Sequence, residues 1–160
     1  MVLTLPEENQ TLLIINCAKS WQEILTERVY ICPAVGTAFK FHPCRYFGVY
    51  HDKKVSHVIN IEAVIDVQSD DTTSIRWING GGREIDYRQR AVDAANRLRP
   101  KAEFPVQVFI LGYPQTADFK KDSKGGMLGS KVYRDVTSVG VKTAGDLARK
   151  LMDKKWSDLE

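Results

Sequence analysis

The fold is decided by one stretch of sequence: Arg45-Tyr-Phe-Gly-Val-Tyr-His51, then Asp52-Lys-Lys54, then Val55 to Val67. Two runs rich in aromatic and β-branched residues flank a short polar connection, which is the pattern of a β-hairpin. The second arm is longer than the usual ~5–6 residues of a strand, so we expect it to bend, as strands do around a barrel. Strict alternation would place Val55, His57, Ile59, Ile61, Ala63, Ile65 and Val67 on one face and Ser56, Val58, Asn60, Glu62, Val64 and Asp66 on the other.

The segments outside the hairpin indicate a mixture of strands and helices. The expected strands are 11–17 (where a helix is nearly as well supported), 28–32, 74–78, 105–111 and 131–139. We expect helices at 21–25, capped by Ser20, at 86–98, and after Thr143, with Leu147, Leu151 and Trp156 turned inward. The stretch 112–130 is expected to be irregular. This order predicts a single α+β domain over residues 1–160, built on a curved, barrel-like mixed sheet flanked by helices.

Composition narrows the class of protein. A chain of 160 residues, 43% hydrophobic and 27% charged, is long enough for one domain with a packed core and a charged exterior. The longest apolar run, 12–15, is far shorter than the roughly 18 residues that span a bilayer, so no membrane association is expected. Three cysteines without a C-x-x-C pair, and no secretory pattern in residues 1–10, favour a reducing cytoplasm.

Known catalytic and cofactor motifs are absent from the sequence. The glycine-rich segment 124–131 has its glycines too close and its serine before its lysine, so it is not a Walker A loop. His42-Pro-Cys44 offers one loose pair of metal ligands, whereas structural zinc sites show two paired sets. We therefore expect neither a metal, nor a cofactor, nor a catalytic residue.

Two carboxylates on the long strand suggest an alternative. Glu62 and Asp66 fall on the same outward face if the strand alternates strictly, so together they could hold a magnesium ion in a nuclease. The acid-x-lysine element expected of such an enzyme is missing from the neighbouring strands. Solvent-facing carboxylates remain the simpler interpretation of both residues.

A basic segment between 119 and 134 is the strongest candidate for a binding site. Its glycines allow close approach of a ligand to the backbone, and its cations attract phosphates without reading sequence. A solvated surface loop is nearly as good an interpretation. The predicted phosphate-binding residues are Lys120, Lys121, Lys124, Lys131 and Arg134.

The aromatic residues of the hairpin are the second candidate. Tyr46 and Tyr50 share one face and flank Gly48, which leaves room for a flat ring between them. Stacking of a base on an aromatic ring contributes ~1–3 kcal/mol. More often such tyrosines bury their rings in the core and hydrogen-bond through their hydroxyls. Trp77, beside Arg76, is open to the same two interpretations.

The hairpin sequence, with its aromatic first arm, Lys-containing turn and long second arm, resembles the PUA-like superfamily, most closely its EVE, YTH and ASCH branches. Some EVE-like domains stand at the N-terminus of modification-dependent restriction proteins. The resemblance implies a small curved barrel with a pocket for a flipped, often methylated, base. Carried over residue by residue, it gives Tyr46, Tyr50, Ser56 and Asn60 as pocket residues, to which we add Trp77.

The sequence therefore predicts a non-enzymatic nucleic-acid-binding module with a base pocket beside a basic loop. A net charge of +3 permits such a partner without requiring it. DNA is expected in preference to RNA, and the chain is expected to serve a larger multidomain or multi-subunit assembly. The alternatives are the nuclease with Glu62 and Asp66, and a protein-interaction domain of a defence or regulatory system.

Overall fold

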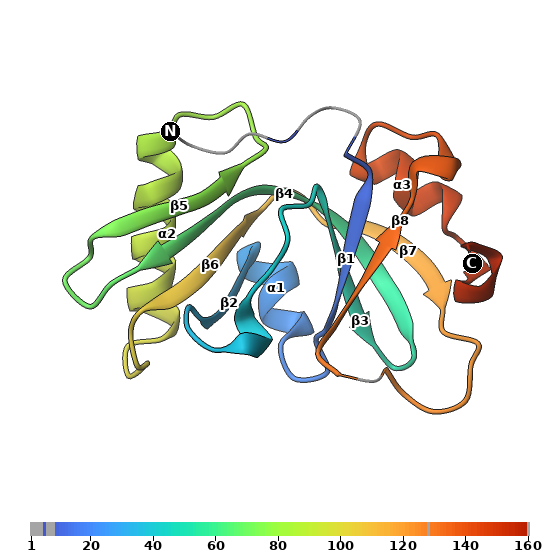
Figure 1. The fold of residues 1–160 in the computed structure, drawn as a ribbon, viewed down its shortest axis with the longest axis horizontal. Helices are drawn as coiled ribbons and strands as arrows, with labels where there is room; N and C mark the ends of the chain where they lie inside the picture. Colours follow the sequence, from blue (N-terminus) through green and yellow to red (C-terminus); the bar gives the residue numbers. More distant parts are fainter. Residues whose placement is uncertain (1–4, 6–8, 128, 160) are drawn as a thin grey trace.

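The computed structural model describes residue 5 and residues 9–127 and 129–159. In these ranges the chain is an α+β structure with one nine-stranded mixed sheet and three α-helices, which confirms the predicted class (Figure 1). None of the helices is long and apolar enough to cross a membrane, as far as the described residues go.

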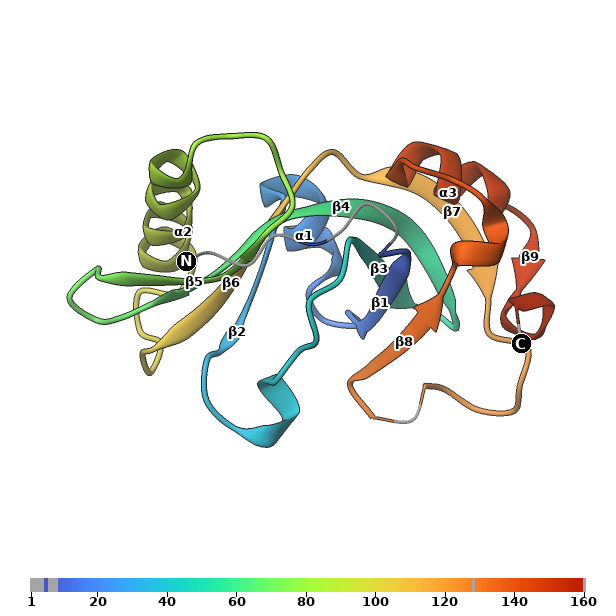
Figure 2. The ribbon, with the colours of Figure 1, turned by 45° about the horizontal axis from the view of Figure 1, so that its top comes forward.

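The long strand β4 (Lys54–Val67) organises the sheet. Its first half pairs with β3 (Tyr46–His51) on one edge and β7 (Gln115–Lys120) on the other. Its second half pairs with β5 (Thr73–Ile78) and β6 (Val106–Leu111). The strand curves as it passes from one half to the other, so the two halves of the sheet share a single bent strand (Figures 1 and 2). The predicted hairpin is therefore confirmed.

The sheet does not close into a barrel. Its main path runs β2-β6-β4-β3-β1-β8, and the two end strands, β2 (Val29–Pro33) and β8 (Lys131–Asp135), do not pair with each other. Strand β1 (Thr11–Asn16) is parallel to β3, and the short β9 (Lys154–Lys155) is parallel to β7. The predicted curved sheet is thus present in an open form.

Bulges interrupt the alternation expected of β4. Tyr50 pairs with Val55 and Val49 with His57, which leaves Ser56 as an extra residue. Val55 and Val58 consequently pack into the same hydrophobic cluster. The expectation of a strict period of two is wrong here, because an inserted residue resets which side each following side chain faces.

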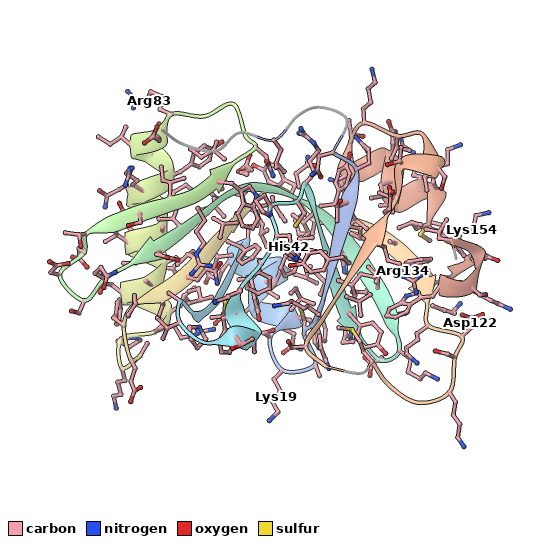
Figure 3. All side chains as sticks on the ribbon, viewed as in Figure 1. Lys19, His42, Arg83, Asp122, Arg134 and Lys154 are labelled. Carbon is pink, nitrogen blue, oxygen red and sulfur yellow. The ribbon has the colours of Figure 1, made fainter. Side chains whose placement is uncertain are left out.

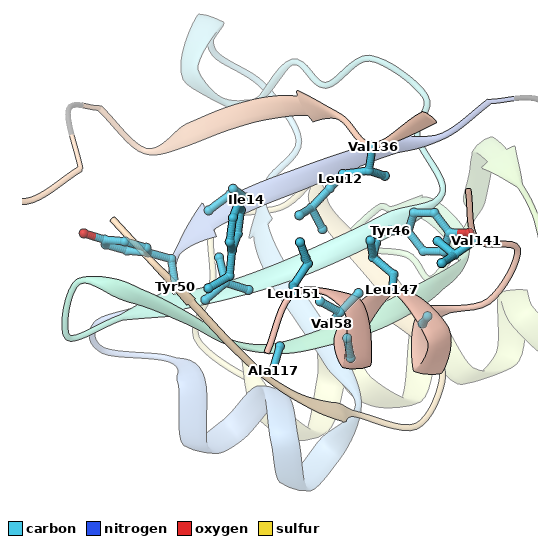
Figure 4. Packing of buried hydrophobic residues seen from close by; sticks show 14 of the residues in the cluster. Leu12, Ile14, Tyr46, Tyr50, Val58, Ala117, Val136, Val141, Leu147 and Leu151 are labelled. Carbon is cyan, nitrogen blue, oxygen red and sulfur yellow. The ribbon is translucent and has the colours of Figure 1, made fainter. Parts of the chain in front are cut away.

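Three helices cover the sheet at different places. Helix α2 (Glu84–Leu98) packs Tyr87, Ala91 and Ala95 against the half that contains β5 and β6. Helix α3 (Ala144–Lys150) begins as predicted, since the Thr143 hydroxyl accepts a hydrogen bond from the Asp146 amide at 3.1 Å. It packs against the other half of the sheet, as Figure 4 shows for Leu147.

Several boundaries differ from those expected. Helix α1 (Trp21–Glu27) follows Ser20, whose side chain makes no capping hydrogen bond. Strand β7 lies within the stretch expected to be irregular. Strand β8 ends at Asp135, before the short 3-10 helix Thr137–Val139. Two further 3-10 turns occupy Thr37–Phe39 and Trp156–Leu159.

Candidate functional site

The two hairpin tyrosines lie in the hydrophobic cluster to which α3 contributes. Tyr46 is fully buried and Tyr50 is 4% exposed, and both belong to the cluster that contains Leu147 (Figure 4). A Cβ placed on Gly48 would lie 3.3 Å from side-chain atoms of Leu12, Ile14 and Val55. The space between the tyrosines is therefore filled by the protein's own side chains.

The other predicted pocket residues lie elsewhere. Trp77 is 1% exposed in a different cluster, with its indole N–H donating to the Cys44 carbonyl at 3.1 Å. Asn60 is exposed, beside Gly112. Ser56 faces the imidazoles of His51 and His57. The structure thus does not bring the five predicted residues into one pocket, and none of them lines the cavity of about 340 Å³ between β2, β6 and the end of α2.

Ser56 belongs to a hydrogen-bonded chain that sequence reasoning missed. The Asp52 carboxylate lies 2.7 Å from Nδ1 of His51, and Nε2 of His51 lies 3.0 Å from the Ser56 hydroxyl. The same hydroxyl lies 2.8 Å from Nδ1 of His57. The ring of Trp21 stacks on His51 at 4.5 Å with an interplanar angle of 6°, which fixes the imidazole plane. We call Trp21, His51, Ser56 and His57 the histidine cluster.

The bulge in β4 produces this cluster. Because Ser56 is the extra residue, it projects toward both imidazoles instead of into the core. The order Asp52, His51, Ser56 matches that of an acid, a base and a nucleophile. However, Ser56 is only 8% exposed and its oxygen is enclosed by two imidazoles and the Val49 carbonyl. The hydroxyl therefore serves as a bridge between the histidines, not as an open nucleophile.

His57 is the titratable end of the cluster. Its pKa is lowered from the ordinary 6.5, chiefly because burial disfavours the charged form, with further contributions from His51 and Lys54. A lowered pKa keeps this imidazole neutral near pH 7. The face gains a positive charge there as the pH falls.

The predicted phosphate-binding residues have different surroundings. Lys121 donates to the Ser123 hydroxyl at 2.6 Å and to the Gly125 carbonyl at 3.0 Å, so it holds its own loop together. Lys124 is exposed and has no side-chain partner in the described part of the chain. Lys120 forms an ion pair with Asp118 at 2.9 Å. These three lysines lie at the same end of the molecule.

The two residues of β8 are engaged at other places. Lys131 donates to the carbonyls of Ala38 and Lys40 at 3.0 and 2.5 Å and lies over the ring of Phe41. Burial lowers the pKa of Lys131. The Arg134 guanidinium lies over the Trp156 ring at 5.2 Å. Lys131 therefore fastens the segment that follows β2, and Arg134 packs at the C-terminal end.

A row of basic residues crosses four neighbouring strands. His51 on β3 is directly opposite Lys54 on β4, Lys54 is opposite Lys120 on β7, and Lys120 is opposite Lys155 on β9. Directly opposed residues project from the same side of a sheet, whereas the adjacent pair of Val55 and Phe119 faces the core. We call His51, Lys54, Lys120 and Lys155 the basic row. It includes one predicted residue, Lys120, and joins it to the histidine cluster through His51.

The carboxylates of the nuclease alternative are not placed together. Glu62 lies 3.4 Å from Arg90 of α2, whereas Asp66 lies 2.7 Å from Arg76 of β5. In the described ranges, no group of three or more His, Cys, Asp or Glu side chains is arranged to hold a metal ion. Each of the two carboxylates is instead paired with its own arginine.

Comparison with known proteins adds no relative. No protein-family model, curated protein or solved structure matches the chain. The site must therefore be interpreted from its own residues.

Sequence reasoning missed five of the candidate residues, which are Trp21, His51, Lys54, His57 and Lys155. One signal was present: in Gln115-Thr-Ala-Asp-Phe-Lys120, apolar residues alternate with polar ones as in a half-buried strand. That pattern places Lys120 on an outward face. Its pairing with Lys54 and Lys155 depends on the register of strands far apart in sequence, which no local pattern contains.

Proposed function

We propose that the protein is a nucleic-acid-binding module that contacts phosphates with the basic row. The observation that carries this proposal is the direct opposition of His51, Lys54, Lys120 and Lys155 across four strands. Like charges placed opposite one another, as on the three lysines, destabilise a sheet. Such a row becomes favourable when a polyanion shares its surface, because binding neutralises the charges and releases condensed counterions.

The dimensions of the row suit a phosphate backbone. Neighbouring strands lie about 4.8 Å apart, so four strands span roughly 14 Å. Phosphates of one DNA strand are separated by about 3.4 Å along the helix axis, so the row can meet several of them. Lys53 and Lys124 are exposed at the same end and extend the positive surface. Contacts of this kind give affinity without sequence preference.

The finer features expected from the PUA-like resemblance are part of the proposal. These are a barrel-like curvature of the sheet and DNA in preference to RNA. A role within a larger assembly, and the cytoplasmic location that the cysteines favour, also belong to the proposal. Recognition of a flipped base remains a prediction. Tyr46, Tyr50 and Trp77 are enclosed in this structure, so the phosphate contacts are the better supported half of the hypothesis.

Fluorescence anisotropy with labelled single- and double-stranded DNA and RNA tests the proposal. The test variant combines Lys54→Ala, Lys120→Ala and Lys155→Ala. The matched control combines Lys40→Ala, Lys101→Ala and Lys142→Ala, which removes the same charge at exposed positions outside the row. We expect the row variant to bind at least about tenfold more weakly to every sequence, and the control to bind like the wild type. No binding by the wild type at low salt, or equal losses in both variants, would overturn the proposal.

A further inference from the structure

The hydrogen-bonding capacity of Ser56 couples the two histidines. A hydroxyl has one proton to donate, and its oxygen lies within hydrogen-bond distance of Nε2 of His51 and of Nδ1 of His57. If Ser56 donates to His51, the other imidazole must donate to Ser56. If Ser56 instead donates to the Val49 carbonyl, 3.5 Å away, both imidazoles can donate to its oxygen, so the two rings share this one hydroxyl as a common partner.

Protonation of His57 is compatible with this network. Its Nδ1–H then donates to Ser56, Ser56 donates to His51, and Nδ1–H of His51 donates to Asp52. One new donor remains, the Nε2–H of His57, which has no partner among the described residues. A phosphate oxygen is the acceptor that a nucleic acid would supply to such a group.

We infer that the histidine cluster makes phosphate binding on this face proton-linked, so that nucleic acid binds more tightly when His57 takes up a proton. The inference rests on the proposed function, because the basic row supplies the ligand. His51 belongs to both the row and the cluster, which places the linked proton beside the phosphate contacts.

The other charged groups near His57 are already paired, or stay charged at mildly acidic pH, so they do not supply the same proton uptake. Asp52 bonds His51 at the turn, and Lys54 precedes the bulge on the same strand. On β7, Thr116 is opposite His57, with Asp118 and Lys120 further along that strand. Hydrogen bonding with each other lowers the pKa of Asp118 and raises that of Lys120, so both stay charged at mildly acidic pH. From α1, the uncharged ring of Trp21 stacks on His51, and Glu23 is bound to Arg99.

The test measures affinity for a thymidine oligonucleotide from about pH 8 to about pH 5.5 at constant ionic strength, with a pH-insensitive fluorophore. Thymine does not take up a proton in this range. If a bound phosphate raises the pKa of His57 by one unit, the affinity rises by up to about tenfold on acidification. We expect His57→Asn, whose amide can replace the Nδ1 contact with Ser56, to reduce that rise to about twofold or less.

His42 provides the matched control. It lies on the segment after β2, where its backbone amide bonds the Tyr133 hydroxyl, and it is not part of the cluster. His42→Asn should keep the full wild-type rise. The inference is overturned if wild-type affinity does not change with pH, or if His57→Asn keeps the wild-type rise. Absence of binding at every pH would instead overturn the proposed function, so the two failures are distinguishable.

Discussion

The two ends of the molecule treat their positive charges differently. At the end covered by α2 the cations are mainly arginines. At the end that holds the β3–β4 turn and β9, which we call the hairpin end, they are mainly lysines, as the labelled Arg83 and Lys154 illustrate in Figure 3. In the described part of the chain, each of six arginines near α2 bonds a carboxylate. These pairs are Arg76–Asp66, Arg83–Asp86, Arg88–Glu84, Arg90–Glu62, Arg97–Glu27 and Arg99–Glu23.

The lysines of the hairpin end are less fully neutralised. Lys53 and Lys121 donate to backbone carbonyls and the Ser123 hydroxyl, which are uncharged acceptors. Five aspartates also lie here, but Asp118 alone among the described ones is ion-paired with a lysine of this end. This end holds seven lysines (53, 54, 120, 121, 124, 154 and 155) and five aspartates (52, 118, 122, 153 and 158), so among these residues two positive charges are in excess.

The comparison shows that the group bonded to a cation determines whether that cation stabilises the fold or stays available to bind an anion. An arginine paired with a carboxylate contributes little net field, whereas a lysine bonded to a carbonyl keeps its full charge. The α2 end therefore uses its cations to hold elements together. The hairpin end has the cations available for an external anion.

Reversing the charge of the row should produce the largest effect. Lys54→Glu, Lys120→Glu and Lys155→Glu together place carboxylates opposite one another and repel phosphates, so we expect binding to fall by about 100-fold or more. Electrophoretic mobility shift and anisotropy at low salt would measure this. Retained binding by a variant whose circular dichroism is unchanged would show that the row is not the contact surface.

Breaking an ion pair at the α2 end should change stability but not binding. The Arg99–Glu23 pair, with a 2.6 Å contact and both side chains about one-third exposed, joins α2 to α1. Glu23→Gln should lower the free energy of unfolding by about 1 kcal/mol and leave affinity for nucleic acid unchanged. Asp86→Asn, at the exposed Arg83 pair, is the control and should cause no measurable change in urea denaturation. A loss of DNA binding in Glu23→Gln would contradict the assignment of the α2 end to stability alone.

Removing the acidic partner of the row should strengthen binding. Asp118→Asn keeps an acceptor for Lys120 at a similar position but removes the negative charge beside the row. We expect a twofold to threefold gain in affinity, roughly the effect of one surface ion pair, and a steeper dependence on salt. Weaker binding would mean that Asp118 is needed to hold Lys120 in place.

The smallest effect concerns stability and pH. The pKa of His57 is lower in the folded protein than the 6.5 of a free histidine, so below that value the unfolded chain binds more protons. The free energy of unfolding should therefore fall as the pH drops through 6.5. In the His57→Asn variant it should fall by less over the same pH range. Urea denaturation on both sides of pH 6.5 measures the difference. An equal fall in the free energy of unfolding of both proteins would contradict the burial of His57 that lowers its pKa.

Sequence patterns predict the elements better than they predict the site. The hairpin, the helix before Pro100 and the Thr143 cap follow from local signals, because each depends on residues a few positions apart. The β4 bulge does not, since the inserted residue is defined only by the register in which β4 pairs with β3. The stacking of Trp21 on His51, 30 residues away in sequence, depends on where α1 meets the hairpin. The site was missed because it is assembled by strand register and a bulge.

The salt dependence of binding tests the central claim most directly. It should be compared for the wild type, the row variant with alanine at 54, 120 and 155, and a variant with alanine at Arg83, Arg88 and Arg97 of the α2 end. We expect the slope of log affinity against log salt to become shallower by about 1 for each lysine–phosphate interaction that the row variant can no longer make. The arginine variant should keep the wild-type slope. Equal changes in both variants, or an unchanged slope in the row variant, would contradict the claim that the hairpin end alone carries the phosphate contacts.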